Sequence, residues 1–239
     1  MKARSRHIQS IERAMALLEL LKAYPQGARL TDLCVPNGLT KSTAHGLLDT
    51  LADMGYVTHQ GSRYLLGSRI QTLAHAGHDR NERLRQLFTP ALQAFNESCE
   101  ANCFLAIPSG ARTYLTLDAL DAGGHPLTQQ DDDQRDALRT SAVGKVFLAH
   151  DPMLARRVRR SAPLGKDLEH ELLRINECGY ALDIQASEPG LNCMAIPLRV
   201  KGKVVGALGT SGPADRLAPQ VMQLMAKRAM RDLFELVKY

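Results

Sequence analysis

Apolar residues recur at steps of three and four between residues 39 and 57, and this spacing predicts an amphipathic helix. Thr40 is its expected N-cap, because the hydroxyl can accept a free amide of the first turn. Gly55 can take the positive φ that ends a helix, and a strand is expected to follow. The polar side of the first turns carries one cation and short side chains: Lys41, Ser42, Thr43, His45 and Gly46.

Two further helices are expected before this stretch. The first, over residues 11–23, is predicted to have Ser10 as its cap and a buried stripe that begins at Ile11. The second is short, with Thr31 as its cap, and Pro36 ends it.

A β-hairpin is predicted after the third helix. Residues 56–66 alternate between apolar and polar around a glycine-containing turn at 60–62. This order of helices and hairpin is typical of a winged helix-turn-helix domain, predicted here over residues 1–67. Such domains insert the polar N-terminal turns of one helix into the DNA major groove. Taken alone, the helix fits an ordinary surface helix equally well, and its neighbours favour the DNA-binding interpretation.

The rest of the chain predicts a second, mixed domain. A short helix over residues 68–76, broken by Gly77, is expected to be a linker helix within residues 68–79, and a longer helix follows. Beyond it, hairpin-joined strands and grouped helices favour an antiparallel α+β domain over residues 80–239 rather than a doubly wound sheet. The strands are expected at residues 103–107, 113–117, 180–183, 193–200 and 204–211.

Composition bounds the class of protein. The chain has 239 residues, 44% of them hydrophobic, which is typical of a folded protein long enough for two domains. No apolar run approaches the length of a membrane span, and the N-terminus lacks the apolar core of a signal peptide. Five scattered cysteines indicate a reducing compartment, so a cytoplasmic protein without membrane contact is expected.

No metal site and no cofactor are expected. The close cysteine pair, Cys99 and Cys103, has no second pair to complete a tetrahedral zinc set. The consecutive acids at 131–133 lie near His125, but their side chains would point in different directions, so a solvated loop is expected. The glycine-rich phosphate loop of a nucleotide-binding fold is also missing from the sequence.

Basic residues are concentrated in the first third of the chain. Residues 1–78 hold nine Lys or Arg against five Asp or Glu, and the whole chain has a net charge of +5. This excess indicates a polyanion partner for the N-terminal domain, and a solvated basic surface is the alternative. Four arginines between residues 156 and 160 are expected to lie exposed on a surface helix rather than to form a second anion site.

Motifs in both halves resemble the IclR family of bacterial transcriptional regulators, in family order along nearly the whole chain. The first half has Ser-Ile-Glu-Arg-Ala at 10–14, Leu-Ala-Asp-Met-Gly-Tyr-Val at 51–57 and Tyr-Leu-Leu-Gly at 64–67. The second half has Ala-Val-Gly-Lys at 142–145, Gly-Tyr-Ala at 179–181, Glu-Pro-Gly at 188–190, Cys-Met-Ala at 193–195 and Ser-Gly-Pro at 211–213. The resemblance implies a winged helix-turn-helix domain and a GAF-like effector-binding domain, which bind a double-stranded DNA operator as a homodimer or a dimer of dimers.

The resemblance also implies which residues contact DNA. They lie at the third helix, facing the groove, and on the hairpin, near phosphate: Thr40, Lys41, Ser42, Thr43, His45 and Arg63. The hydroxyls and Lys41 would contact the DNA backbone and so position the protein on it, and His45 would reach a base edge. This chain departs from the family at two positions, having Thr40 for the usual proline and Gly46 for the usual arginine. We therefore expect a different operator or weaker phosphate contact.

In the second half the resemblance implies an effector pocket. Its members are the side-chain positions Asp183, Cys193, Gly209 and Ser211 and the backbone amides of Ala142 and Val143. Amides at a helix start suit a carboxylate, because unpaired N–H groups and the helix dipole converge there. Gly209 stands where the family has a serine, so we expect one hydroxyl fewer and room for a ligand bulkier than a small keto acid.

The predicted function is a DNA-binding transcriptional regulator, expected to be a repressor, whose operator affinity is controlled by a small organic acid. An enzyme is not expected, but two alternatives stay open. A cysteine-dependent hydrolase would use Cys193 as nucleophile with Asp183 or a histidine assisting, although an inert buried thiol is commoner in such an apolar pattern. A constitutive architectural DNA-binding protein would respond to no small acid.

Overall fold

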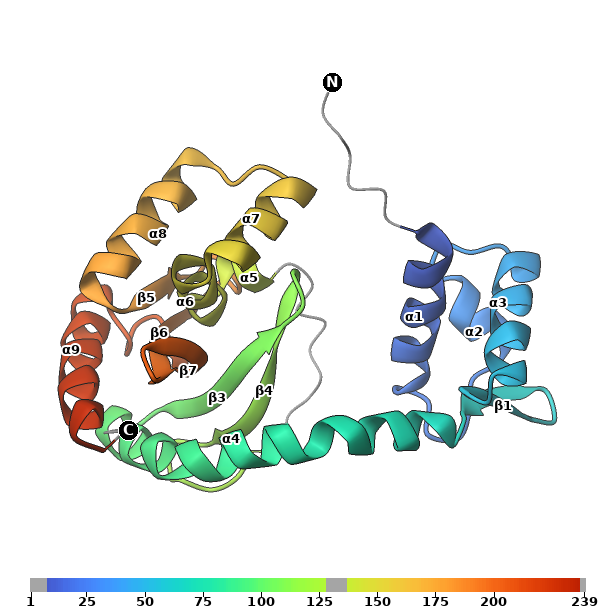
Figure 1. The fold of residues 1–239 in the computed structure, drawn as a ribbon, viewed down its shortest axis with the longest axis horizontal. Coiled ribbons are helices and arrows are strands. Elements are labelled where there is room, and N and C mark those ends of the chain that lie inside the picture. Colours follow the sequence, from blue (N-terminus) through green and yellow to red (C-terminus); the bar gives the residue numbers. More distant parts are fainter. Residues whose placement is uncertain (1–7, 128–136, 237–239) are drawn as a thin grey trace. The chain divides into compact units, whose positions relative to one another are not determined.

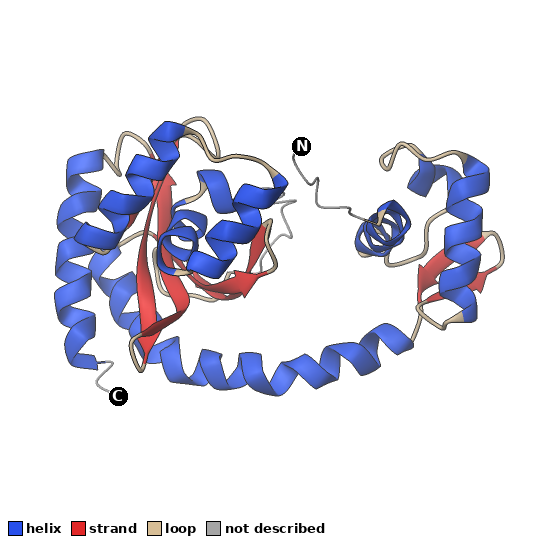
Figure 2. Cartoon of the chain, turned by 45° about the horizontal axis from the view of Figure 1, so that its top comes forward, coloured by secondary structure: helices blue, strands red, loops and turns tan. Residues whose placement is uncertain are grey.

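The computed structural model of the protein describes residues 8–127 and 137–236. The chain divides into two units, Met1–Asn81 and Glu82–Tyr239, which are described separately (Figure 1 and Figure 2). Within the described ranges, no helix has the length and apolar character to cross a bilayer. In the same ranges, His, Cys, Asp and Glu side chains form no cluster of three that could hold a metal ion. The acids at 131–133 lie outside the described residues.

The first unit contains α1 (Gln9–Leu21), α2 (Leu30–Cys34), α3 (Lys41–Asp53), β1 (Val57–Gln60) and β2 (Arg63–Leu66). The two strands form an antiparallel hairpin, and the turn between them contains Gly61 at φ +61°. The apolar sides of the helices and the hairpin share one core, whose buried members include Leu17, Leu33, Leu48, Val57 and Tyr64. The prediction of a winged helix-turn-helix domain is confirmed.

The caps of the first two helices differ from the prediction. Ser10 lies inside α1, which begins one residue before it, and Ile11 is exposed rather than buried. Thr31 lies inside α2 because the Asp32 carboxylate, in the first turn, accepts the backbone N–H of Arg29 (2.9 Å). A carboxylate in this position satisfies the helix start as a cap hydroxyl would. Both predicted hydroxyl caps are therefore wrong.

One continuous helix, α4 (Arg69–Cys99), replaces the two shorter helices that the sequence predicts. The predicted break at Gly77 is wrong, because a lone glycine costs a helix only about 1 kcal/mol relative to alanine. Pro90 also lies inside α4. The boundary between the two units, after Asn81, falls within this helix.

The second unit is built around a five-stranded sheet. Its strands are β3 (Asn102–Ser109), β4 (Thr113–Leu120), β5 (Ala181–Ile184), β6 (Leu191–Val200) and β7 (Lys203–Pro213), in the order β4-β3-β7-β6-β5. All neighbouring pairs are antiparallel. The prediction of an α+β domain with an antiparallel sheet is confirmed.

Helices cover both faces of this sheet (Figure 1). On one face, the C-terminal half of α4 and α9 (Pro219–Leu236) pack on apolar side chains of β6 such as Met194 and Ile196. The other face carries α5 (Ala137–Thr140), α6 (Ala142–His150), α7 (Pro152–Ser161) and α8 (Lys166–Cys178). There α6 packs on small residues, Ala195 and Ala207, which let the helix approach the strands closely. The start of α6 therefore lies next to β5, β6 and β7.

Candidate functional site

The N-terminal turn of α3 presents a cluster of hydroxyl groups. Thr40 Oγ1 accepts the backbone N–H of Thr43 (3.3 Å), so Thr40 caps the helix as predicted. The same Oγ1 lies 2.9 Å from Thr43 Oγ1 and 3.2 Å from Ser42 Oγ. Lys41 is exposed beside them and has no ion-pair partner among the described residues. The predicted donors at this turn are thus brought together in one polar, cationic surface.

His45 is held by an acid one turn further along α3. Its Nδ1 lies 3.0 Å from Asp49 Oδ2, and Asp49 Oδ1 lies 3.9 Å from His59 Nε2 on β1. The sequence analysis missed this link, although a spacing of four residues in a helix is its signal. The His45 side chain remains 55% exposed. Asp49 therefore orients the ring without removing it from the surface.

Arg63 lies on the hairpin, as predicted, but it also has a structural contact. Its Nη1 donates to the carbonyl oxygen of Gly27 (2.6 Å), and the backbones of Ala28 and Tyr64 form an isolated bridge next to it. These bonds fasten the hairpin to the loop before α2. A guanidinium has further N–H donors, so the contact with Gly27 leaves some of them for an anion.

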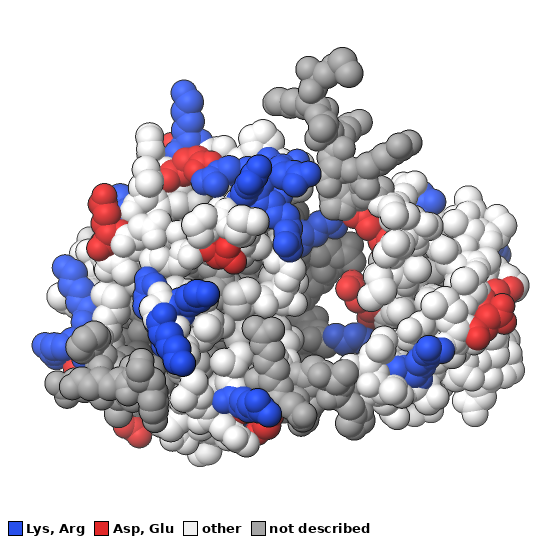
Figure 3. Space-filling view, in the orientation of Figure 1, with Lys and Arg blue, Asp and Glu red and all other residues white. Residues whose placement is uncertain are grey.

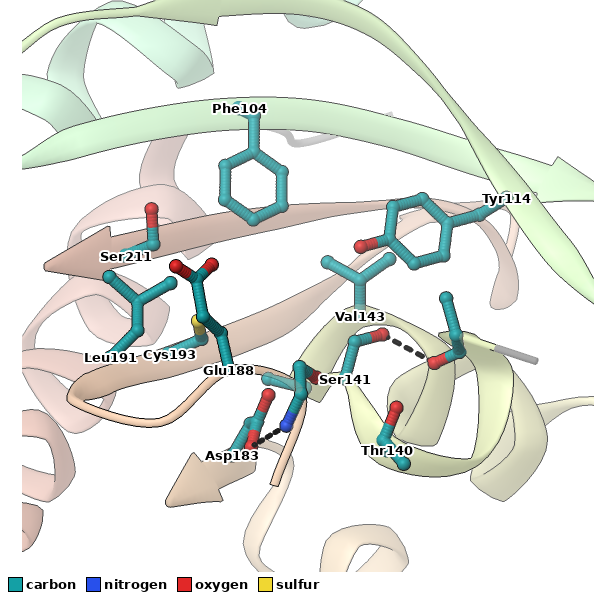
Figure 4. A pocket seen from close by; sticks show the side chains of 13 residues that line it. Phe104, Tyr114, Thr140, Ser141, Val143, Asp183, Glu188, Leu191, Cys193 and Ser211 are labelled. Carbon is teal, nitrogen blue, oxygen red and sulfur yellow. Dashed lines mark hydrogen bonds between the residues drawn. The ribbon is translucent and has the colours of Figure 1, made fainter. Parts of the chain in front are cut away.

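A cavity of about 410 Å³ lies between the start of α6, the loop after β5 and the sheet (Figure 4). Its volume is within the range of roughly 300–1,000 Å³ that is usual for ligand pockets. Asp183, Cys193 and Ser211 line it side by side, since they are direct neighbours on β5, β6 and β7. Ala142 and Val143 line it from α6. The structure thus brings five of the six predicted pocket positions around one cavity.

The start of α6 has two backbone donors without acceptors. Ser141 caps the helix, because its Oγ accepts the backbone N–H of Gly144 (3.0 Å) while its hydroxyl donates to the Ala137 carbonyl (2.7 Å). The next two N–H groups, of Ala142 and Val143, donate to no acceptor within the described part of the chain. Both residues are buried. Unpaired amides at a helix start favour an anion, because the helix dipole is positive there.

Asp183 supplies an acceptor that is also without a partner. The residue is fully buried, and its Oδ1 accepts the backbone N–H groups of Ala186 (2.8 Å) and Ser187 (3.3 Å). Its Oδ2 is buried and has no hydrogen-bond partner in the described part of the molecule. Leaving a buried charged acceptor unpaired is costly. Asp183 Oδ2 therefore keeps unused hydrogen-bonding capacity beneath the cavity wall, with no surface open to the cavity in this structure.

The Cys193 thiol is not activated. Burial, and after it the negative charges of Asp183 and Glu188, raise the pKa of the Cys193 thiol to about 12. Since the thiolate is the reactive form, the fraction that could attack a substrate near neutral pH is very small. The residues that line the cavity within the described chain include no histidine to act as a base.

Gly209, the sixth predicted position, does not line the cavity. It lies directly opposite Phe104 on β3, and a Cβ at position 209 would stand 2.4 Å from two carbons of the Phe104 ring. The ring therefore fills the space of a side chain at 209, and the ring itself lines the cavity (Figure 4). The expectation that Gly209 gives room to a bulkier ligand is wrong, because this glycine accommodates an aromatic ring of the protein.

Comparison with known proteins decides the family. The model of the IclR helix-turn-helix domain matches residues 10–61, and that of the bacterial transcriptional regulator IclR C-terminal domain matches residues 80–232. The chain belongs to the IclR family. The glycerol operon regulatory protein of Streptomyces griseus is 31% identical over 90% of this chain and 89% of its own length. The DNA-binding transcriptional repressor YiaJ of Escherichia coli is 28% identical over 87% of this chain and 79% of its own length.

Solved structures of IclR proteins have the same fold. An IclR family regulator from Brucella abortus superposes with a TM-score of 0.68 at 20% identity, over 98% of this chain and 94% of its own. An IclR homolog from Microbacterium hydrocarbonoxydans, complexed with 4-hydroxybenzoate, superposes with a TM-score of 0.64 at 22% identity, over 92% of this chain and 95% of its own. The prediction of an IclR-type DNA-binding transcriptional regulator, rather than of an enzyme, is confirmed by the family.

Several residues that line the cavity of this IclR protein were not predicted: Phe104, Tyr114, Thr140, Ser141, Glu188 and Leu191. Some of them had a signal, since Ser141 precedes the Ala-Val-Gly-Lys motif and Glu188 begins the Glu-Pro-Gly motif. Phe104 and Tyr114 belong to no motif that marks them as cavity residues. Their place depends on the pairing of β3 with β7 and β4, which a single sequence does not reveal.

The arginines between residues 156 and 160 lie on α7, over which basic side chains gather (Figure 3). Arg159 donates to both carboxylate oxygens of Glu169 on α8 (2.7 and 2.6 Å), and these bonds lower the pKa of Glu169. All four arginines are exposed, as predicted, and none of them lines the cavity of the IclR effector domain.

Proposed function

We propose that this IclR-family chain is a repressor that inserts α3 into the major groove of an operator. The exposed hydroxyls and Lys41 at the start of α3 support this, because short donors and one cation suit contacts to phosphate and groove. Repression is supported by the relative YiaJ, which is named a repressor. The DNA-contacting residues in this proposal are Thr40, Lys41, Ser42, Thr43, His45 and Arg63.

A small organic acid would bind in the cavity and control operator affinity. Its carboxylate would accept hydrogen bonds from the amides of Ala142 and Val143, with Asp183, Cys193 and Ser211 along the opposite wall. The observation that supports this proposal is the pair of unpaired amides at the start of α6, whose residues Ala142 and Val143 line the same cavity as Asp183 within the described chain. An acid that binds one arrangement of the protein more tightly must change operator affinity reciprocally.

The regulator would act as a homodimer or a dimer of dimers in the cytoplasm, where bacterial operators lie. An exposed apolar stripe at the start of α1 supports a second copy, since Ile8, which precedes the helix, and Ile11 and Met15 within it are 61%, 57% and 50% exposed. Two copies would place two α3 helices in successive major grooves, about 34 Å apart. Sedimentation of the full chain with and without operator DNA measures this state.

The experiment for DNA binding uses the DNA directly upstream of the gene. We expect the full chain to bind this DNA about a thousandfold more tightly than random DNA of the same length at physiological salt. Lys41→Ala should weaken binding and reduce the slope of log affinity against log salt by about 0.9, the loss of one phosphate contact. Lys166→Ala, which removes a likewise exposed lysine of the second unit, is the matched control. Equal affinity for both DNAs would refute the proposal.

The constitutive architectural protein is the second reading to be tested. It predicts that no small acid changes the melting temperature or the operator affinity of the full chain. The hydrolase reading has no support from the cavity, because the raised pKa of Cys193 keeps the thiol protonated.

A further inference from the structure

An acidic residue lies on the side of α3 that the proposed function turns towards DNA. Asp49 follows His45 by four residues, so both side chains lie on one face of the helix, away from the buried Ala44 and Leu48. The side chains of Asp49 and His45 are 49% and 55% exposed. A carboxylate beside DNA phosphates is repelled by their negative charge. The position of Asp49 therefore indicates a role other than contact with the DNA backbone.

Two histidines from different elements flank Asp49. On α3, His45 Nδ1 lies 3.0 Å from Asp49 Oδ2, and on β1, His59 Nε2 lies 3.9 Å from Asp49 Oδ1. The His59 ring packs against the ring of Tyr64 on β2, with 4.2 Å between the ring centroids. Tyr64 belongs to the buried core of the first unit. The hairpin therefore holds Asp49 from one side, and Asp49 holds His45 from the other.

The contact with Asp49 decides which nitrogen of His45 is available to DNA. An ionised carboxylate only accepts hydrogen bonds, so Nδ1, the nitrogen next to it, carries the proton of the neutral ring. Nε2 is then the nitrogen with a free lone pair, and it can only accept a hydrogen bond. Without Asp49, the neutral ring would exchange between its two tautomers and turn about its side-chain bonds. Asp49 thus selects one tautomer and one direction for the ring.

We infer that Asp49 is a positioning residue for base recognition: it holds His45 so that Nε2 accepts a hydrogen bond from the exocyclic amine of an adenine or a cytosine. This inference rests on the proposed insertion of α3 into the major groove, and it names the chemical group that His45 reads. Adenine N6 and cytosine N4 are the hydrogen-bond donors of the major groove, whereas guanine and thymine present acceptors there. An accepting Nε2 therefore distinguishes the first two bases from the other two.

The test compares DNA duplexes that differ by one amine. Each base pair of the upstream site is first replaced in turn, and the pair at which the full chain and His45→Ala differ in discrimination is the one that His45 contacts. There, adenine is replaced by purine, or cytosine by pyrimidin-2-one, analogues that lack only the exocyclic amine. In fluorescence anisotropy, we expect the full chain to lose affinity by about three- to tenfold, the effect of one hydrogen bond. His45→Ala should bind both duplexes equally.

Variants of Asp49 separate positioning from charge. Asp49→Ala removes both the negative charge and the acceptor, so it should raise the affinity for all DNA and lower the discrimination between the two duplexes by about two- to fivefold. Asp49→Asn removes the same charge but keeps an oxygen that can accept from Nδ1–H, so it should retain most of the discrimination. Asp53→Ala removes another exposed acid of α3 and is the matched control, which should change both affinities alike.

The outcomes separate this inference from the proposed function. Equal discrimination by the full chain and His45→Ala at every base pair would overturn the inference, and so would a His45 contact that is lost with 7-deazaguanine, because His45 would then be a donor. Unchanged discrimination in Asp49→Ala, or an equal loss in Asp49→Ala and Asp49→Asn, would overturn it as well. In these cases the full chain still prefers its upstream site, and the proposed function stands. If the full chain binds random DNA equally well, the proposed function fails and the inference fails with it.

Discussion

The contact between Gly209 and Phe104 predicts a specific instability. Gly209→Ser would place a Cβ 2.4 Å from two ring carbons of Phe104, whereas carbon atoms pack at about 3.5–4.0 Å. The ring must therefore move by about 1 Å or more away from β7, and overpacking of this kind costs about 1–3 kcal/mol. For a domain of this size, we expect the melting transition of the second unit to fall by about 2–10 °C.

A second substitution separates the clash from other effects of serine. Phe104→Leu shortens the side chain opposite, so the double variant Gly209→Ser with Phe104→Leu should lose less stability than the sum of the two single variants, by about 0.5–3 kcal/mol. Gly165→Ser is the control, because a Cβ there meets no atom within 4 Å. Scanning calorimetry measures the four variants and the unchanged full chain. An unchanged transition for Gly209→Ser, together with strictly additive effects, would refute the reasoning.

Three further predictions follow from the two sites. Gly46→Arg should raise operator affinity and steepen the salt dependence by about 0.9 in slope, because a Cβ at position 46 meets no atom within 4 Å and the longer side chain would then reach phosphate; filter binding at several salt concentrations checks this. Thr40→Ala should destabilise the first unit by about 1 kcal/mol through loss of the α3 cap, measured by urea unfolding. Iodoacetamide at pH 8 should label the exposed Cys178 and spare Cys193, whose thiol has its pKa raised to about 12, so its labelling should increase only as the pH approaches that value; rapid labelling of Cys193 at pH 8 would contradict this.

Most of the architecture was predictable because it depends on local pattern. The stripe of α3, the Thr40 cap and the positive φ of Gly55 are local features, and the structure has each of them. The wrong predictions concerned helix boundaries, where the local preferences of single residues differ by only small free energies. Neither Gly77 nor the hydroxyls of Ser10 and Thr31 outweigh the continuation of a helix through them, so boundaries placed at these residues were wrong.

The cavity was predictable only where motifs mark it. The resemblance named Asp183, Cys193 and Ser211, and the sheet register shows why they act together, since they lie in one row across three strands. Phe104 opposite Gly209 depends on the pairing of β3 with β7, segments far apart in the sequence. The loss of a serine at 209 therefore suggested an empty space that a neighbouring strand in fact fills.

The claim that a bound acid controls operator affinity is tested most directly by measuring each affinity, for acid and for operator, with and without the other ligand. Operator affinity is measured by fluorescence anisotropy with and without a small organic acid that binds the full chain, and acid affinity is measured by calorimetry with and without operator. The account predicts that the acid changes operator affinity by about 5- to 150-fold and that operator changes acid affinity by the same factor. An acid that binds tightly and leaves operator affinity unchanged would contradict it.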